Sequence, residues 1–322
     1  MCDHVSVYNV LETEVKYMYD LIIIGSGPAG LSAAVYGKRA GLNLLVIEEK
    51  PMSGGQILNT YEVDNYLGMP GMNGFDMGMK FKEHADAAGA EFKTASVKEI
   101  CDEGEKKIVK TADGTCCEAR ALILATGAEH RMLGVSGEEK YRGKGVSYCA
   151  TCDGAFFRGK DVAVVGGGDV AVEDAIYLAR MCSKVYLIHR RDSLRAAKGL
   201  QDKLTACGNV EIMWNRTVQD IYGSASVETV KLNHVAEKTQ EDLAVQGVFI
   251  AVGMHPNTEA FRDIVPCDEQ GYVIAGEDCV TKTPGIFAAG DLRTKQVRQI
   301  VTAVADGACA AASVERYLTG RH

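Results

Sequence analysis

Two cysteines three positions apart, Cys149 and Cys152, have the clearest capacity for chemistry in this chain of 322 residues. At this spacing two thiols can close into a disulfide and reopen without refolding of the chain, which is what electron transfer to another disulfide requires. Asp153 follows directly and could move the proton that thiolate chemistry demands. The segment 149–154 is therefore predicted to be a redox-active dithiol.

A zinc site or a purely structural disulfide would use the same residue types. A zinc site needs a second pair of Cys or His ligands at short spacing. The other cysteines are scattered singly, apart from the adjacent Cys116 and Cys117, and no two of the seven histidines lie within five residues of each other. The pattern favours redox chemistry, and no metal site is expected.

Composition and charge narrow the class of protein. A chain of this length that is 47% hydrophobic suits a globular protein of about two domains. Eleven irregularly spaced cysteines fit a reducing compartment better than a secreted disulfide framework. The net charge of −8 argues against nucleic acid or a membrane surface as a partner. With no apolar run of 18 residues and no signal-peptide pattern, we expect a cytoplasmic protein whose residues 1–17 form an added N-terminal arm.

A nucleotide-binding fold is predicted at the start of the chain, upstream of the dithiol. An apolar strand over residues 19–24 runs into Gly25-Ser26-Gly27-Pro28-Ala29-Gly30, a helical pattern continues to about Ala40, and a second strand, 44–47, ends at Glu48. Glycines let backbone approach a pyrophosphate, the helix N-terminus faces its charge, and the terminal acid can accept a ribose hydroxyl. Another apolar strand, 121–127, ends in Thr126 and Gly127, where backbone can touch a ligand.

A second such fold follows the dithiol. A strand over 161–165 enters Gly166-Gly167-Gly168-Asp169, a helix runs to about Met181, and a strand over 184–188 ends at His189-Arg190-Arg191, with Arg195 beyond. Arginines where the first fold has an acid suit a 2′-phosphate, so this nucleotide is predicted to be NADP(H) rather than NAD(H). Asp192 could oppose this, and a solvated basic turn is the alternative reading.

The two halves repeat one plan, which suggests an internal duplication. The strand at 247–253 corresponds to the strand at 121–127. In each half, therefore, a glycine-rich nucleotide-binding motif is followed by a long insertion and then by an apolar strand that ends in glycine. A further strand, 285–291, carries Asp291 at its tip, followed by Arg298-Gln299 and a helix of small residues. We infer that this tail returns to the first domain. The predicted fold is α/β with two Rossmann-like domains. The first is formed by residues 1–130 together with 255–322, and the second, residues 131–254, is inserted within it.

Two dinucleotide sites and one dithiol are the parts needed to pass electrons from a nicotinamide, through a flavin, to a disulfide. The segments 26–30, 54–56, 149–154, 166–169, 189–192, 290–291 and 298–299 carry these parts. From Met18 on, their order and spacing resemble the low-molecular-weight bacterial thioredoxin reductases. This resemblance implies FAD and NADPH as cofactors, thioredoxin as the protein substrate, and a homodimer.

The resemblance also implies roles for single residues. Cys152 would face the flavin, Cys149 would attack the partner and Asp153 would be the acid. The residues implied for FAD are Gly25, Gly27, Pro28, Ala29, Gly30, Glu48, Gly55, Gln56, Asn65, Thr126, Gly127, Gly290, Asp291, Arg298 and Gln299. Those implied for NADPH are Gly166, Gly168, Asp169, Val170, His189, Arg190, Arg191 and Arg195. Val170 stands where serine is common in that family, and Leu194 where an aromatic residue is common.

Other functions share much of this pattern. A related flavoprotein could reduce a different thiol partner, take electrons from ferredoxin, or oxidise a small dithiol with oxygen. A member of another class would be a sensor that binds NADPH and uses the dithiol to change shape without turnover. Continuous loss of NADPH in the presence of oxidised thioredoxin separates these possibilities.

Overall fold

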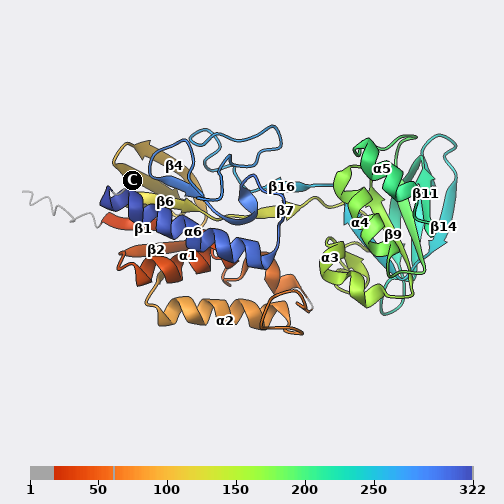
Figure 1. The fold of residues 1–322 in the computed structure, drawn as a ribbon, viewed down its shortest axis with the longest axis horizontal. Coiled ribbons are helices and arrows are strands. Elements are labelled where there is room, and N and C mark those ends of the chain that lie inside the picture. Colours follow the sequence, from red (N-terminus) through yellow and green to blue (C-terminus); the bar gives the residue numbers. More distant parts are fainter. Residues whose placement is uncertain (1–17, 61, 321–322) are drawn as a thin grey trace, which may run out of the picture. The chain divides into compact units, whose positions relative to one another are not determined.

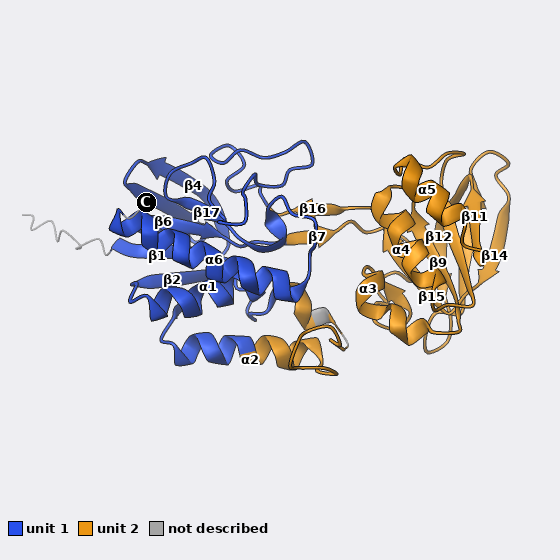
Figure 2. Ribbon diagram, in the orientation of Figure 1, with its two compact units in different colours: residues 1–55, 81–127, 258–322 blue, residues 56–80, 128–257 orange. Residues whose placement is uncertain are grey.

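The computed structural model describes residues 18–60 and 62–320 (Figure 1). The chain divides into two compact units (Figure 2): unit 1 holds residues 1–55, 81–127 and 258–322, and unit 2 holds 56–80 and 128–257. The expected N-terminal arm, 1–17, lies outside the described residues. Residues 56–80 group with unit 2, although the sequence assigns them to the first domain; which ligand each domain binds stays a prediction.

Unit 1 is built on a seven-stranded sheet in the order β3-β2-β1-β6-β5-β4, with β17 beside β6. The parallel strands are β1 (Met18–Ile24), β2 (Leu44–Glu48), β3 (Glu91–Thr94), β6 (Cys116–Leu124) and β17 (Ile286–Ala288). The antiparallel ones are β4 (Val97–Glu103) and β5 (Lys106–Thr111). The run Leu21–Ile24 is fully apolar and buried, as expected for a parallel strand covered on both faces.

Helices α1 (Pro28–Arg39) and α6 (Ile300–Thr319) lie side by side in unit 1 (Figure 1). They approach closely because the contact is made by small residues: a Cβ on Gly307 would lie 2.1 Å from the carbonyl oxygen of Ala29. The tail is thereby fixed against the helix that follows the first glycine-rich loop. The turn η3 (Gly290–Leu292) also belongs to unit 1. The helix α2 (Gly74–Ala87) begins in the segment grouped with unit 2 and ends in unit 1, and η1 (Gly55–Asn59) lies almost wholly in the segment grouped with unit 2.

Unit 2 contains a parallel sheet in the order β11-β10-β9-β15-β8. Its strands are β8 (Val146–Ser147), β9 (Asp161–Gly166), β10 (Lys184–His189), β11 (Val210–Trp214) and β15 (Gly247–Ala251). An antiparallel sheet accompanies it: β12 (Arg216–Tyr222), β13 (Thr229–His234) and β14 (Gln240–Ala244). The helices are α3 (Ala150–Asp153), η2 (Gly154–Phe157), α4 (Asp169–Ala179) and α5 (Lys198–Thr205).

The longer segment of unit 2 begins and ends in a two-stranded ribbon. Strand β7 (Ala128–His130) pairs antiparallel with β16 (Met254–Pro256). The ribbon is therefore the part of unit 2 where the chain enters after residue 127 and leaves before residue 258. No helix within 18–60 and 62–320 is long and apolar enough to cross a membrane.

The predicted α/β fold class is confirmed, and most elements lie where the pattern predicts them. Two strands end earlier than expected: β6 begins at Cys116 and ends at Leu124 rather than 127, and β17 spans only Ile286–Ala288 before the turn η3. In both places a glycine with positive φ, Gly127 (+70°) or Gly290 (+81°), turns the chain out of the sheet.

Candidate functional site

The predicted dithiol is present as a disulfide between Cys149 and Cys152, whose Cα atoms lie 5.3 Å apart. It spans the junction between β8 and α3, with Cys149 as the residue that caps the helix. The Cys149 Sγ accepts a hydrogen bond from the Cys152 backbone N–H at 3.2 Å. Because an N–H directed at sulfur favours its charged form, this geometry stabilises a thiolate on Cys149 once the disulfide opens.

Asp153 adjoins the disulfide and is mostly buried. Burial raises the pKa of its carboxyl, and a hydrogen bond from the Ser147 hydroxyl, at 2.6 Å, opposes that rise. The same hydroxyl oxygen accepts the backbone N–H of Cys149 at 3.1 Å. Ser147 therefore connects the acid to the first cysteine, a role that the sequence analysis missed although the serine lies two residues before Cys149.

Replacing Ser147 by alanine should raise the pKa of Asp153 further, because the hydroxyl stabilises the carboxylate form. If Asp153 supplies a proton during turnover, activity falls as pH rises through this pKa, so the alkaline limb of the pH–rate profile should move to higher pH. Steady-state rates of disulfide reduction, measured from about pH 4, near the ordinary pKa of an aspartate, up to about pH 9, would detect the shift.

The matched control is Ser183→Ala, which removes a hydroxyl that donates to the Gly159 carbonyl in the same unit. It should leave the alkaline limb in place. An unchanged limb in the Ser147→Ala enzyme, or one displaced toward acid, would show that Asp153 does not act as this acid.

The second glycine-rich loop lies at the same edge of the unit 2 sheet as the dithiol. Parallel pairing aligns the ends of the strands, with Gly166 opposite Ala251 and Ser147 opposite Phe249. The loop Gly166–Gly168 follows β9 and opens α4, whose first residues include Asp169 and the exposed Val170. Helix N-terminal N–H groups are thereby presented at this edge, as an anionic ligand requires. The Asp169 carboxylate accepts the Ala197 N–H at 2.7 Å and so ties down the neighbouring loop.

Three arginines follow β10 at this edge. Arg190, Arg191 and Arg195 are all exposed. Within the described part of the chain no acidic side chain pairs with their guanidinium groups, and the Asp192 carboxylate instead accepts the Ser193 hydroxyl at 3.4 Å. The arrangement leaves three cations for a phosphate. His189 differs from them because it is buried and faces two backbone carbonyl groups.

The first glycine-rich loop lies at the corresponding edge of the unit 1 sheet. Ile24 aligns with both Ile47 and Leu124, and Leu124 aligns with Ala288, so four parallel strands end together. Gly25 has φ +101°, and a Cβ on Gly30 would lie 1.9 Å from the Gly25 carbonyl oxygen. Only glycine permits this turn, which is followed by Pro28 and the buried Ala29 at the start of α1.

Glu48 stands at the tip of β2 and faces this loop. Its Oε2 accepts the Ser26 N–H and the Ser26 hydroxyl, each at 2.7 Å, and its Oε1 accepts the Lys50 N–H at 2.9 Å. A carboxylate has about four acceptor positions. Glu48 can thus fix the loop and still accept a ligand hydroxyl, as predicted for a ribose.

Asp291, in η3, shows that unit 1 suits a hydroxyl-bearing ligand. Its Oδ1 is buried and has no hydrogen-bond partner among the described residues. Burial raises the pKa of Asp291, while Lys295 and Arg298 lower it. A buried acceptor without a partner costs about 1–3 kcal/mol or more. A ligand hydroxyl beside Oδ1 would remove this cost, and the ribityl chain and ribose of FAD carry such groups.

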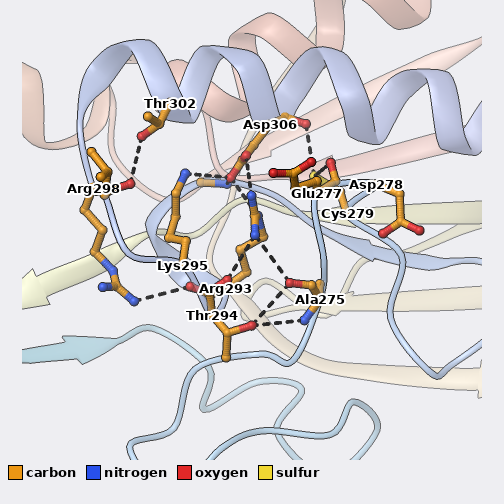
Figure 3. Close-up of polar contacts among 12 residues, drawn as sticks. Ala275, Glu277, Asp278, Cys279, Arg293, Thr294, Lys295, Arg298, Thr302 and Asp306 are labelled. Carbon is orange, nitrogen blue, oxygen red and sulfur yellow. Dashed lines mark hydrogen bonds and ion pairs between the residues drawn. The ribbon is translucent and has the colours of Figure 1, made fainter.

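Asp306 on α6 holds the turn that carries Asp291 (Figure 3). Its two oxygens accept Arg293 Nη2 at 2.7 Å and Arg293 Nε at 2.8 Å, and Oδ2 also accepts Lys295 Nζ at 2.8 Å and the Gly290 N–H at 2.9 Å. All three charged side chains are nearly inaccessible, with 7 to 9% exposure. The sequence analysis identified none of them.

The other predicted residues are distributed between the two units. In unit 1, Gly55 lies beside Gly27, the Arg298 Nε donates to the Asp291 carbonyl at 3.3 Å, and Gln299 caps α6. In unit 2, the Gln56 side chain donates to the Ala128 carbonyl, and Asn65 is exposed. Their part in binding a cofactor stays a prediction. Within 18–60 and 62–320 there is no cluster of three or more His, Cys, Asp or Glu side chains able to hold a metal.

Comparisons with known proteins agree on one family. Residues 19–307 match the family described as pyridine nucleotide-disulphide oxidoreductase. A thioredoxin reductase of Listeria innocua is 48% identical, with 94% of each chain covered, and one of Bacillus subtilis is 46% identical, covering 94% of this chain and 95% of the relative. The crystal structure of thioredoxin reductase from Streptococcus pyogenes is 46% identical, covers 95% of this chain and 99% of that one, and superposes with a TM-score of 0.90.

Proposed function

Because this chain belongs to the thioredoxin reductases of the pyridine nucleotide-disulphide oxidoreductase family, we propose that it passes electrons from NADPH, through FAD and Cys149–Cys152, to an oxidised thioredoxin. The chain is an oxidoreductase whose family uses flavin and nicotinamide nucleotide cofactors. The observation that carries the proposal is the disulfide at a sheet edge that also presents a glycine-rich loop and three arginines.

Each unit has residues suited to one cofactor. In unit 1, the Gly25–Gly30 turn, Glu48 and the orphaned Asp291 oxygen would hold FAD. In unit 2, the Gly166–Gly168 loop and the arginines that follow β10 would hold NADPH. A bound flavin accepts a hydride from a nicotinamide and can deliver the electron pair to a disulfide. NADPH, one proton and one disulfide thereby yield NADP⁺ and two thiols.

The chain's own residues carry out the exchange with the partner. The Cys149 thiolate, stabilised by the Cys152 N–H, attacks one sulfur of the partner's disulfide and forms a mixed disulfide. Cys152 then attacks Cys149, restores the internal disulfide and releases the partner as a dithiol. Asp153, whose pKa is raised by burial, is suited to hold a proton near these sulfurs.

Turnover with oxidised thioredoxin tests the proposal directly. Purified protein reconstituted with FAD should consume one NADPH for each thioredoxin disulfide that it reduces, continuously and under anaerobic conditions. Consumption that requires oxygen would indicate a dithiol oxidase, and a single stoichiometric reaction without turnover would indicate a redox sensor. We also propose a homodimer, which the resemblance implies, and a cytoplasmic location, which the irregular cysteine usage suggests. Light scattering of the purified holoprotein tests the dimer.

The choice of coenzyme should depend on Arg190 and Arg191. Replacing both by alanine removes charged contacts to a 2′-phosphate, worth about 1.5–3 kcal/mol, or roughly tenfold to a hundredfold in NADPH affinity. NADH has no 2′-phosphate, so its affinity should change little. Dissociation constants for NADP⁺ and NAD⁺, measured by calorimetry on the oxidised holoenzyme, give this comparison.

A matched control is Lys198→Ala, a solvent-exposed cation that pairs with Asp202 on α5 of the same unit. It removes one charge from the region without removing the two arginines, and should alter both affinities less than the double variant alters NADP⁺ binding. If the double arginine variant weakens both coenzymes by the same factor, the assignment of these side chains to a phosphate is wrong.

A further inference from the structure

The imidazole ring of His189 lies between two backbone carbonyl groups. His189 ends β10 and is only 6% exposed. Its Nδ1 is 2.9 Å from the Gly166 oxygen and its Nε2 is 3.0 Å from the Ser193 oxygen. Carbonyl oxygens only accept hydrogen bonds, whereas a neutral imidazole can donate through one nitrogen alone. Both contacts are hydrogen bonds only when the ring is an imidazolium; in the neutral ring one nitrogen lone pair faces an oxygen lone pair.

The two carbonyl groups belong to the two loops that form the second nucleotide site. Gly166 begins the glycine-rich loop, and Ser193 lies in the loop that carries the three arginines. The ring also lies directly under Gly167, where a Cβ would come within 2.2 Å of it, and the Arg195 N–H donates to the Gly167 oxygen at 2.8 Å. His189 therefore holds one loop in register with the other from beneath.

The surroundings of the ring oppose its charge in the protein alone. Burial lowers the pKa of His189, the bonds to Gly166 and Ser193 raise it, and the nearby cations Arg195 and Arg190 lower it. The other charged side chains of the elements around the ring are Arg191 and Asp192 on the arginine loop, Asp169, Glu173 and Asp174 on α4, Asp161 on β9, Lys184 on β10 and Glu211 on β11. Burial raises the pKa of Asp174 to about 7, so the test must distinguish this carboxyl from His189. The residues of the neighbouring strands that lie next to the ring are Gly166 at the end of β9 and Trp214 at the end of β11. The centroids of the His189 and Trp214 rings are 6.3 Å apart in an edge-on arrangement, and neither Gly166 nor Trp214 has a titratable side chain. The two carbonyl contacts thus favour the imidazolium, whereas burial and the neighbouring arginines favour the neutral ring.

We infer that His189 takes up a proton from solvent when NADP(H) binds, and that the resulting imidazolium is a positioning residue that locks the glycine-rich loop to the arginine loop. A 2′-phosphate brings about 1.5 to 2 negative charges next to the arginines. It thereby offsets the part of the lowering of the His189 pKa that Arg195 and Arg190 cause, while the two carbonyl contacts already favour the imidazolium. The inference rests on the proposed function, because it requires the nucleotide to bind at this edge.

Proton uptake fixes the sign of the pH dependence. When binding raises the pKa of a group, affinity falls as pH increases between the two pKa values, by up to about tenfold per pH unit. Protonation of the 2′-phosphate itself, near pH 6, acts in the opposite direction because the dianion binds more tightly. Between pH 7 and 8.5 the phosphate is largely ionised, so a decline in NADP⁺ affinity that is present in the wild type and absent in His189→Gln reports His189.

Calorimetry on the oxidised, FAD-loaded protein tests the inference. NADP⁺ is titrated at pH 7 in two buffers of different ionisation enthalpy, and the difference in heat gives the number of protons exchanged. We expect net proton uptake when NADP⁺ binds, and less for NAD⁺, which lacks the phosphate. His189→Gln keeps a polar side chain without a titratable ring and should abolish the uptake. His234→Gln, which changes a histidine on β13 of the same unit, should leave it intact.

The outcomes distinguish failure of the coenzyme assignment from failure of the proposed role of His189. If NADP⁺ does not bind at any pH, the coenzyme assignment fails, and this inference fails with it. If NADP⁺ binds without proton uptake, or if the uptake survives in His189→Gln, only the role of His189 is overturned. Should the variant fail to fold, ¹⁵N spectra of the wild-type imidazole decide: two protonated nitrogens in the NADP⁺ complex support the inference, and one neutral tautomer contradicts it.

Discussion

Replacing either Cys149 or Cys152 by serine should abolish reduction of thioredoxin, with a loss of roughly three orders of magnitude or more in turnover. The exchange needs both sulfurs, because one attacks the partner's disulfide and the other resolves the mixed disulfide. Neither change enlarges or empties the core, since both cysteines are only partly buried at the β8–α3 junction. Bound FAD and its reduction by NADPH should therefore be retained.

The two variants should differ in what they trap. Cys152→Ser keeps Cys149, the sulfur that the Cys152 N–H stabilises, and removes the resolving thiol. It should accumulate a mixed disulfide with an oxidised thioredoxin that persists in denaturing, non-reducing electrophoresis. Cys149→Ser should accumulate none. Cys182→Ser, which alters a buried cysteine elsewhere in unit 2, should retain turnover and serves as the control. A stable adduct with Cys149→Ser alone would reverse the roles of the two sulfurs.

The glycine-rich loops and their strands are predictable from sequence because their cause is local. The apolar run Leu21–Ile24, which a glycine-rich turn follows at once, is typical of a strand buried on both faces, and the turn at Gly25 admits no side chain. The same reasoning identifies the strand before Gly166. Parallel strands end at one edge of a sheet, so placing Glu48 and Asp291 near the first loop requires only the order of the strands.

The groups that the sequence analysis missed act over longer range. Ser147 is an ordinary serine until folding directs its hydroxyl at Asp153. Asp306 lies in a helix of small residues, and an acidic residue in such a helix would be expected to face solvent. In the structure it is buried and bonded to Arg293. The only sequence signal was an acid among alanines and glycines on a helix that must pack closely. Contacts of this kind depend on which faces meet, and residue spacing does not specify that.

Glu138 shows that residue spacing also fails to predict contacts made by loops. Residues 133–137, two of which are glycine, have the composition of a linker. In the structure the buried Glu138 carboxylate accepts the N–H groups of Leu133 and Gly134 at 3.0 and 2.8 Å, and the Tyr148 hydroxyl at 2.8 Å. The segment is thus fastened within unit 2, and the ribbon of β7 and β16 occupies the ends of the inserted chain.

Replacing Asp306 by asparagine should destabilise unit 1 by about 3–5 kcal/mol, because it leaves the buried cations Arg293 and Lys295 without their carboxylate. The same carboxylate accepts the Gly290 N–H, so the turn that carries Asp291 should loosen as well. We therefore expect weaker retention of FAD in addition to lower stability. Urea titration monitored by far-UV circular dichroism measures the loss of stability. The fluorescence of released flavin measures the weaker retention of FAD.

Two variants separate these effects from a general loss of charge. Glu315→Gln makes the same chemical change on an exposed position of α6 and should cost little. Combining Asp306→Asn with Arg293→Met removes the stranded guanidinium, so the double variant should be more stable than the sum of the single changes predicts. Strict additivity would mean that the two side chains do not stabilise each other.

The destabilisation should also depend on pH in a defined direction. Burial alone would raise the pKa of Asp306, but hydrogen bonds from Arg293 and Lys295 hold it below the usual 3.8. A group whose pKa is depressed on folding contributes stability above its unfolded-state pKa and loses it as pH falls through the folded-state value. The difference in unfolding free energy between wild type and Asp306→Asn should thus be constant from pH 8 to about pH 5 and shrink below about pH 4. A difference that grows toward acid would rule out the ionised carboxylate as the group that holds this turn.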